Sequence, residues 1–405
     1  MKGINNFSEI GKLNKVLLHR IGKEVEALVP ENFERLLFDD IPFLKVARKE
    51  HDSFAQLLRD NDVEVIYYVD ETAKALRRPG AKEAFVKEIT KASHLHSDAS
   101  REAAASYLMS LDEHALVEKV IEGVTKEDLK EFVGNSIADI LSAGRQFYMD
   151  PMPNLYFTRD PGACVGNGLN VHNMSTEARK REAILLKYMY RYNEEFSGEN
   201  SPLWYNNDMA LSMEGGDVLV LNKETVAIGL SQRTTAEAIE AFAYNLLGHS
   251  SFKKIIVFDI PKCRAFMHLD TVFTMVDYDK FTIHPEIEGP LSLYEITLGK
   301  GGLPVVKSTT SELEDLLKSV LKVPAVKLIR CGGNDPIAAQ REQWNDGSNT
   351  LCIAPGKVVT YERNVVTNDL LDKEGIDVLT IPSAELSRGR GGPRCMSCPV
   401  HRDDL

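Results

Sequence analysis

The sequence has few cysteines, no long apolar segment and no excess of basic charge, and each absence removes a class of function. Six cysteines in 405 residues are too few for a disulfide scaffold. No run approaches the ~20 apolar residues of a membrane span, and the first residues lack the apolar core of a secretion signal. With 48 basic and 60 acidic residues, the chain also lacks the basic face of a nucleic-acid-binding protein. We therefore expect a cytoplasmic protein that binds neither nucleic acid nor membrane. Its net charge of −12 is compatible with a small cationic ligand.

The pattern of short apolar runs predicts an α/β fold. Hydrophobic residues make up 43% of the chain and charged residues 27%, as in soluble globular proteins. Runs rich in β-branched, aliphatic or aromatic residues predict strands at 15–19, 63–69, 217–221, 226–230, 254–258, 325–330, 358–361 and 378–381. Helical spacing of apolar residues predicts helices at 43–61, 234–247 and 310–321. Strands that alternate with helices indicate an α/β architecture, and glycine turns at 215–217 and 332–335 hint at repeated modules.

One stretch, from about residue 72 to 141, has little strand signal and much helix signal. Apolar faces at 103–109, 116–121 and 129–133 predict short amphipathic helices. The pairs Ser110/Glu113 and Thr125/Asp128 have the spacing of capping boxes. Since strand signal returns at Ala163, we predict a catalytic α/β domain from residues 1–71 and 142–405, interrupted by a helical domain at 72–141.

A cysteine near the C-terminus has the surroundings of a nucleophile. Cys395 follows the glycine-rich segment 389–394, which contains Arg390 and Arg394. Free cysteine has a pKa near 8.5. A cation at about 4 Å stabilises a thiolate by roughly 4 kcal/mol at an effective dielectric of about 20. Since one pKa unit corresponds to about 1.4 kcal/mol, such a cation could lower the pKa of the thiol by more than about one unit. We therefore expect an exposed, partly deprotonated thiol. Three other cysteines adjoin apolar runs and are expected to be inert core thiols: Cys164, Cys263 and Cys352.

Three further segments, 154–160, 213–217 and 267–271, supply carboxylates and an imidazole. In an extended stretch, His268 and Asp270 would point to the same face and could share one cavity. Burial of Asp270 among apolar neighbours costs several kcal/mol unless a cation or donors meet it. A cationic ligand would satisfy that requirement.

Each of these segments also has an interpretation without catalysis. The His268/Asp270 pair could be a hydrogen bond in the core, and the glycines between Glu214 and Asp217 could serve a turn. Asp160 precedes a proline, as in many loops that begin with an Asx turn.

A non-enzymatic interpretation uses the C-terminal segment alone. Cys395, Cys398 and His401 have a spacing found in zinc and redox modules, although no fourth ligand stands nearby. A single Arg-Gly-Gly on an acidic chain is weak evidence for binding of nucleic acid.

Taken together, these segments resemble a known family. They are 157–161 (FTRDP), 214–217 (EGGD), 268–271 (HLDT) and 390–399 (RGGPRCMSCP), with further matches at 7–18, 36–40 and 178–182. The ordered set closely resembles the arginine deiminases, which are guanidine-modifying hydrolases, over essentially the whole chain. The resemblance implies a five-bladed pseudosymmetric α/β propeller of ββαβ modules with an inserted helical domain. It also implies hydrolysis of L-arginine to L-citrulline and ammonia in arginine catabolism, no metal or other cofactor, and a homodimer or higher homo-oligomer.

The resemblance also assigns residue roles. Cys395 would attack the guanidinium carbon and form a covalent amidino-thioether, and His268 would act as acid and then as base. Glu214 would orient His268, and Asp160 and Asp270 would hold the guanidinium. Substrate binding would fall to Asn154, Phe157, Arg179, Asp217, Arg233 and Arg390.

The same catalytic residue types occur in related enzymes, the agmatine deiminases and amidinotransferases. Because agmatine has no carboxylate, Arg179 and Arg233 favour free L-arginine as the substrate.

Overall fold

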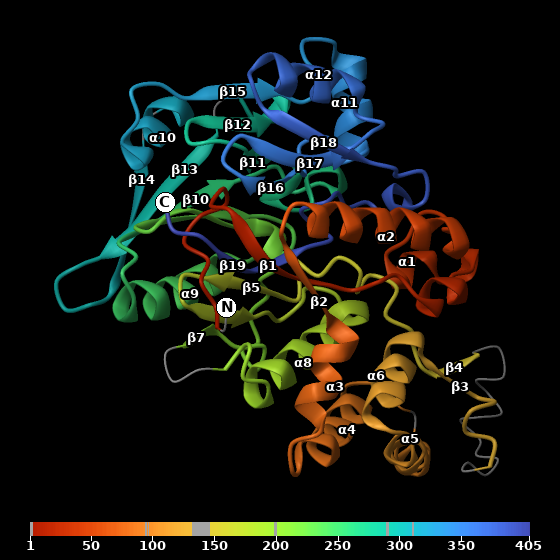
Figure 1. The fold of residues 1–405 in the computed structure, drawn as a ribbon. Coiled ribbons are helices and arrows are strands. Elements are labelled where there is room, and N and C mark those ends of the chain that lie inside the picture. The colour runs from red at the N-terminus through yellow and green to blue at the C-terminus, as the bar shows by residue number, and fades with distance from the viewer. Residues whose placement is uncertain are drawn as a thin grey trace.

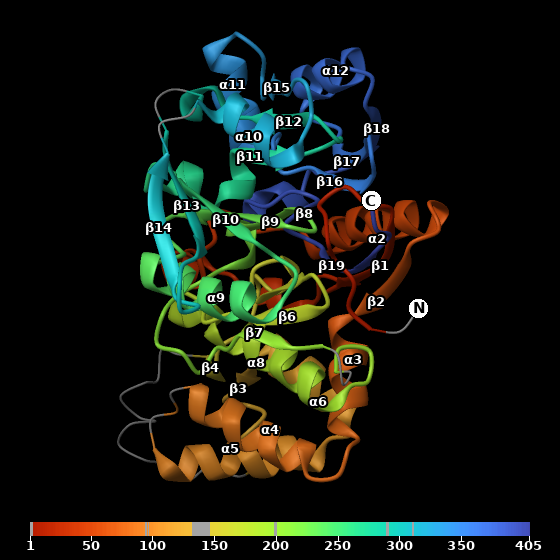
Figure 2. The same cartoon turned by 90° about the vertical axis from the view of Figure 1, so that its left-hand side faces the viewer.

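The structure is a computed structural model that describes residues 3–93, 95, 97–131, 146–197, 201–288, 291–309 and 312–405. An α/β body carries a group of helices at one end, and the strands β1 and β19 lie side by side within that body (Figure 1; Figure 2). Within the described residues, no helix is both long enough and apolar enough to cross a bilayer.

Five of the six sheets in the described residues share one pairing pattern. In each, two strands pair antiparallel and the second pairs parallel with a third. The sheets are β19 (Cys398–Arg402), β1 (Leu13–Leu18), β2 (Glu64–Tyr67); β5 (Gly162–Val165), β6 (Gly168–Val171), β7 (Leu203–Tyr205); β8 (Val218–Asn222), β9 (Thr225–Leu230), β10 (Lys254–Asp259); β11 (Phe273–Met275), β12 (Lys280–Ile283), β15 (Lys327–Arg330); and β16 (Leu351–Ala354), β17 (Lys357–Tyr361), β18 (Asp377–Ile381). An antiparallel hairpin, β13 (Ser292–Leu298) and β14 (Pro304–Thr309), extends the third of these sheets beyond β10.

A helix connects the second and third strands of each sheet, because parallel strands need a crossover connection. These helices are α2 (Leu44–Asp60), α8 (Glu177–Tyr192), α9 (Ala236–His249), α10 (Leu313–Leu321) and α12 (Val365–Lys373). On α2 the buried residues recur at helical spacing (Leu44, Ala47, Phe54, Ala55 and Leu58), so one face packs on the sheet and the other meets solvent. Two further helices, α1 (Phe33–Leu36) and α11 (Pro336–Trp344), lie in loops between strands.

The helical group consists of α3 (Tyr68–Leu76), α4 (Ala81–Ala92), α5 (Asp98–Ser110) and α6 (Glu113–Glu122), followed by a short hairpin, β3 (Val124–Thr125) and β4 (Phe147–Met149). Figure 2 shows these helices at the end of the molecule away from α11 and α12. Phe85, Leu108 and Val117 pack in one core cluster with Leu185 and Met189 of α8, which joins the helical group to the body.

The predicted secondary structure agrees with the structure in most segments. All eight predicted strands overlap strands of the structure, and the predicted helices coincide with α2, α9, α10, α5 and α6. Residues 310 and 311 of one predicted helix lie outside the described residues, as do 132 and 133 of another. Residues 126–131 form turns, so the helix predicted at 129–133 is wrong over its described part.

The two predicted capping boxes have different outcomes. The N-cap of α6 is Asp112 and not Ser110, because the Asp112 carboxylate accepts the backbone N–H groups of His114 and Ala115. Thr125 and Asp128 do exchange reciprocal bonds, between Thr125 N and Asp128 Oδ2 and between Asp128 N and Thr125 Oγ1, but they stabilise a turn.

Candidate active site

Equivalent loops of the five sheets supply the candidate site. Each loop immediately precedes the first strand of a sheet, and each ends in polar residues that face the others. Asp160 stands before β5, Glu214 and Asp217 before β8, Asp270 before β11, Asn349 before β16 and Cys395 before β19. Repetition of one module thus places reactive side chains from distant parts of the sequence around a common centre.

A cavity of about 440 Å³ opens at this centre. Its lining includes eight of the predicted site residues: Asn154, Phe157, Asp160, Arg179, Arg233, His268, Arg390 and Cys395. The three remaining predicted residues, Glu214, Asp217 and Asp270, are buried outside the lining. The structure therefore brings the predicted nucleophile and the predicted acid–base group to one cavity.

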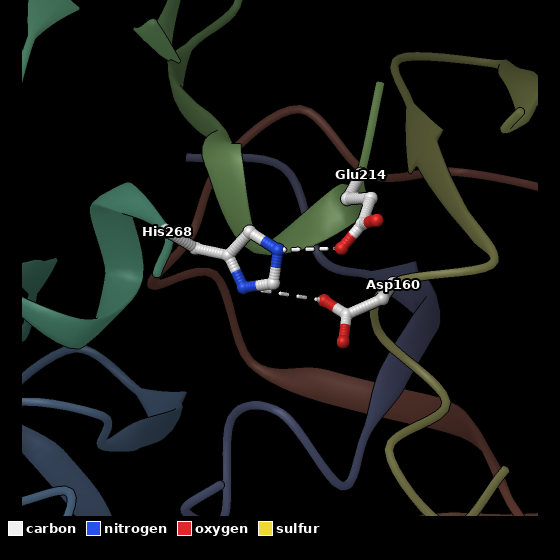
Figure 3. Close-up of side chains that lie close together, drawn as sticks. All are labelled: Asp160, Glu214 and His268. Atoms are coloured by element: carbon white, nitrogen blue, oxygen red, sulfur yellow. Dashed lines mark hydrogen bonds and ion pairs between the residues drawn. The ribbon is translucent and has the colours of Figure 1, made fainter. Parts of the chain in front are cut away.

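His268 lies between two carboxylates (Figure 3). Its Nε2 is 2.8 Å from Glu214 Oε2, and its Nδ1 is 3.8 Å from Asp160 Oδ1. Burial by itself would lower the pKa of His268, but the charges of Asp160, Glu214 and Asp217 raise this pKa to about 9. The imidazole packs against Gly216, where a Cβ would lie 2.7 Å from the ring. The ring is therefore held in place and carries a proton at neutral pH.

The predicted strand through His268 and Asp270 is wrong. Residues Leu269–Thr271 form a 3₁₀ helix, since the N–H and hydroxyl of Thr271 both bond to the His268 carbonyl. Asp217 Oδ1 accepts the N–H of Leu269 at 2.8 Å and fixes this turn. As a result, His268 lines the cavity, whereas the buried side chain of Asp270 contacts Arg394 and Cys395.

Asp270 lies against the sulfur of Cys395, at 3.7 Å between Oδ2 and Sγ. Its Oδ2 also accepts a bond from Arg394 Nη1 at 2.7 Å. Arg394 is fully buried, pairs with Glu9 as well, and donates to the carbonyl of Val218. The Oδ1 atom of Asp270 is buried and has no hydrogen-bond partner in the part of the chain that the structure describes. This oxygen therefore has unused capacity to accept a hydrogen bond, although Asp270 does not line the cavity.

Cys395 is buried, contrary to the expectation of an exposed thiol, with 4% of its surface accessible. Burial raises the pKa of this thiol well above its ordinary value, and Asp270, Asp160 and Asp346 raise it further. Arg394 opposes them only partly, because its charge is already balanced by Asp270 and Glu9. The position of Arg394 beside Cys395 is visible in the sequence, whereas its carboxylate partners come from distant segments.

Arg179 is bound by protein groups on every side. Its Nη1 is 2.5 Å from Asp160 Oδ2, its Nε bonds to Glu182, and its Nη2 donates to the carbonyls of Asn154 and Phe157. Arg233 is less constrained, with its Nη1 3.6 Å from Glu214 Oε1 and 3.5 Å from Ser175 Oγ. Arg179 and Arg233 were both predicted to bind the carboxylate of the substrate. Of the two, Arg233 has the guanidinium with fewer protein partners.

The other predicted binding residues have mixed surroundings. Asn154 donates to the carbonyl of Leu36 at 2.7 Å, and Phe157 packs on Tyr156 with ring centroids 4.0 Å apart. Asp217 accepts hydrogen bonds from Ser231, Thr234 and Leu269, so both of its oxygens are occupied by protein donors and neither faces the cavity.

Asn349, which was not among the predicted site residues, positions the candidate nucleophile Cys395. Asn349 Oδ1 accepts the backbone N–H of Cys395 at 2.9 Å, and its Nδ2 donates to the carbonyl of Asp270 at 3.2 Å. An asparagine after Gly347 and Ser348 reads as an ordinary turn residue. Arg394 had a detectable signal, its place beside Cys395, but its partner Glu9 is 385 residues away in sequence.

The cysteines do not form the predicted alternative zinc site. Cys398 and His401 are three residues apart in β19, so their side chains leave opposite faces of the strand. Among the described residues, the only cluster with metal-ligand spacing is Asp160, Glu214 and His268, whose ligand atoms lie within 4.8 Å of one another. Cys164 and Cys352 are buried as predicted, but Cys263 is exposed because it lies in the loop after β10.

Comparisons with known proteins agree with the geometry. The family model described as "Arginine deiminase" matches residues 34–402. A relative from Clostridium perfringens (strain SM101 / Type A), named "Arginine deiminase", is 50% identical over 410 residues, which is 100% of this chain and 99% of the relative.

Two solved structures share the fold at low identity. An amidinotransferase of saxitoxin biosynthesis from Microseira wollei has a TM-score of 0.56 at 15% identity, over 99% of this chain and 98% of that one. The N-terminal domain of ArgZ, covalently bound to a reaction intermediate, has a TM-score of 0.54 at 12% identity, over 96% and 98%.

Proposed function

The chain belongs to the arginine deiminase family, and from that premise we propose that it hydrolyses L-arginine to L-citrulline and ammonia. The reaction is a step of arginine catabolism and proceeds through a covalent intermediate on Cys395. The observation that carries this proposal is the Cys395 sulfur at a cavity that His268 also lines, with the carboxylate of Asp270 3.7 Å from the sulfur through its Oδ2.

A guanidinium ion fits the charges of this site. Asp160 and Asp270 are both almost fully buried, and Asp270 Oδ1 lacks a partner among the described residues. A planar cation whose N–H donors form a fork matches two such carboxylates. The same positive charge counteracts the carboxylates that hold the proton on Cys395, so binding of the substrate lowers the pKa of the thiol. The proton is lost to solvent as the cation enters.

In the first half of the reaction, the Cys395 thiolate attacks the guanidinium carbon and forms a C–S bond. The tetrahedral adduct collapses when one terminal nitrogen takes a proton from the His268 imidazolium and leaves as ammonia. Glu214, which is 2.8 Å from the ring, holds His268 in orientation for this transfer. An amidino-thioether remains on the sulfur.

In the second half, water attacks the carbon of the amidino-thioether. His268, now neutral, accepts one proton from that water. The C–S bond then breaks as the remaining hydroxyl proton passes to the departing sulfur, which restores the thiol. The products are L-citrulline and ammonia, and His268 again carries the proton. A carbon that already bears positive charge needs no metal to polarise it, so we expect no metal or cofactor requirement.

Cationic residues of the cavity lining would bind the α-carboxylate. We assign this role to Arg233 and Arg179 with help from Asn154, while Phe157 packs on the aliphatic stem. Since Arg179 already bonds to Asp160 and Glu182, its larger contribution is to position Asp160. Asp217 supports the turn that carries His268, and Arg390 stands at the cavity lip.

We further propose that the five sheets are blades of a pseudosymmetric ββαβ propeller, with residues 72–141 as an inserted helical domain. The shared strand pairing and the equivalent positions of the site loops support this arrangement. The expectations of a cytoplasmic protein and of a homodimer or higher homo-oligomer remain proposals.

The function is tested by incubating the protein with L-arginine, agmatine and a peptide with an internal arginine, and by measuring ammonia and ureido product. Only L-arginine should be converted efficiently, because only it brings a free carboxylate to Arg233. Equal conversion of agmatine would instead identify an agmatine deiminase. Product that forms only when an acceptor amine is added would identify an amidinotransferase.

A further inference from the structure

Arg390 carries the same guanidinium group that the site is proposed to bind, and it lines the cavity beside Cys395. The inference below rests on the proposed function. A flexible side chain at the lip of an acidic cavity competes with the substrate cation unless something holds it elsewhere. The contacts of Arg390 therefore determine whether its guanidinium stays at the lip.

The backbone around Arg390 is fixed by packing. A Cβ on Gly389 would collide with Tyr156 Oη, and a Cβ on Gly391 would collide with the Phe157 ring. The carbonyl of Gly391 accepts a bond from Tyr361 Oη at 2.7 Å. Arg390 itself has a left-handed backbone, with φ 64° and ψ 56°, at the end of the 3₁₀ helix Leu386–Gly389. These glycines serve close packing, so the Arg390 guanidinium moves only through its side-chain torsions.

The guanidinium of Arg390 lies over the ring of Trp344, with Cζ 3.3 Å from the ring centroid. Trp344 is the last residue of α11 and is 48% exposed. The chain after it is well fixed, because the N–H of Gly347 bonds to the Glu342 carbonyl and the carbonyl of Asn345 accepts from Asn364. Tryptophan is the side chain that attracts a cation most strongly through its ring face.

A buried carboxylate stands two residues beyond this ring. Asp346 is 5% exposed, and its Oδ2 has no hydrogen-bond partner in the described part of the chain. Burial raises the pKa of Asp346 to about 7, and the charge of Arg390 opposes that rise, so the two groups interact electrostatically. Ring and carboxylate together give the Arg390 guanidinium a defined place at the lip.

We propose that Trp344 is a positioning residue that holds the Arg390 guanidinium at the cavity lip and so keeps it away from the carboxylates that receive the substrate. Loss of the ring removes one of the groups that hold Arg390 and lets its guanidinium compete more often for the substrate position. That competition raises KM and leaves the chemical step unchanged.

The test is a double-mutant cycle on steady-state citrulline formation with Trp344→Ala, Arg390→Ala and the double variant, and with Trp344→Phe as the conservative control. Trp344→Ala should raise KM about three- to tenfold, the range of a cation–π contact, with little change in kcat. Trp344→Phe should retain most of the wild-type KM. In the Arg390→Ala background, Trp344→Ala should have no further effect on KM.

An unchanged KM in Trp344→Ala, or the same rise with Arg390 absent, overturns the proposal. If the wild type forms no citrulline from L-arginine, the proposed function has failed, and a second measurement still tests the contact. Trp344 is half-exposed whereas Trp204 is buried, so acrylamide quenches mainly Trp344 fluorescence. Arg390→Ala should increase this quenching, and unchanged quenching contradicts the stacked arrangement.

Discussion

Two buried histidines in different regions of the molecule show what the carboxylates of the site contribute. His51, on α2, is fully buried beside Phe54, and neither ring nitrogen has a partner among the described residues. Burial lowers its pKa to about 3. His268 is equally enclosed, yet the carboxylates around it raise its pKa to about 9. The difference in pKa arises from the neighbouring charges and not from the depth of burial.

Neighbouring charge acts in the opposite sense on catalysis at Cys395. Burial is the largest cause that raises the pKa of this thiol, and Asp270, Asp160 and Asp346 raise it further, whereas Asp160 also helps to raise the pKa of His268. Without a ligand, the proposed acid His268 is therefore protonated and the proposed nucleophile Cys395 is a thiol. A cation that enters beside Asp160 and Asp270 offsets the contribution of these carboxylates to the pKa of the thiol, so in the proposed mechanism the thiolate forms when the site holds its substrate.

The largest expected effect comes from replacing the nucleophile. Cys395→Ser should lower kcat by at least about 10³-fold, because a serine hydroxyl has no comparable anionic form at neutral pH. Citrulline assays on the purified variant measure this loss. Cys398→Ser, three residues away and also buried, is the matched control and should retain turnover; comparable turnover by both variants would refute Cys395 as the nucleophile.

Asp270→Ala should lower kcat/KM by about 10³-fold, since it removes a guanidinium acceptor and leaves Arg394 partly unpaired. Asp217→Ala, which loosens the His268 turn without touching the cavity, should cost about tenfold. Circular dichroism checks that both variants fold. A larger loss in Asp217→Ala than in Asp270→Ala would contradict the assignment of Asp270 to guanidinium binding and of Asp217 to the His268 turn.

Glu214→Gln tests the charge that sustains the proton on His268. In the wild type, kcat/KM, which reports groups of the free enzyme, should persist as pH rises and fall near pH 9, the pKa of His268. Removal of one carboxylate lowers this pKa, so the alkaline limb of kcat/KM should move to lower pH and kcat should fall about 10²-fold. An alkaline limb that does not move would separate Glu214 from the titration of His268.

The smallest effect concerns His51 and folding stability. Its pKa in the folded chain, about 3, lies below the ordinary value near 6.5, so the unfolded chain binds the extra proton first. The stability that a neutral His51 contributes is present above pH 6.5 and is lost as pH falls toward 3. In urea unfolding, His51→Phe should lose less stability than the wild type between pH 7 and pH 5; identical acid profiles would contradict the low pKa.

The sequence predicted local structure and residue types better than it predicted pairings. Apolar periodicity located β9 and α9 within a few residues, because those patterns depend on neighbours in the chain. Cys395 could be selected because a glycine-rich loop and flanking arginines are local features. Its burial could not be predicted, because it depends on Asn349 and Asp270, which approach only in the folded chain.

The ion-pair partners of the buried arginines also could not be predicted, because they too depend on the fold. Arg394 was expected to lower the pKa of the thiol, but Glu9 reaches it from the opposite end of the sequence and offsets its charge. In the same way, Arg179 was predicted to be a ligand for the substrate carboxylate, and the structure shows it bonded to Asp160 and Glu182.

The central claim, that burial and nearby carboxylates keep the Cys395 sulfur protonated until a cation arrives, is tested most directly by the ultraviolet absorbance of the thiolate. The measurement is the difference spectrum between wild type and Cys395→Ser, recorded without ligand from pH 6 to pH 9. We predict no thiolate absorbance from Cys395 at pH 7 and a rise only toward the alkaline end. Full thiolate absorbance at pH 7 in the ligand-free protein would contradict the account.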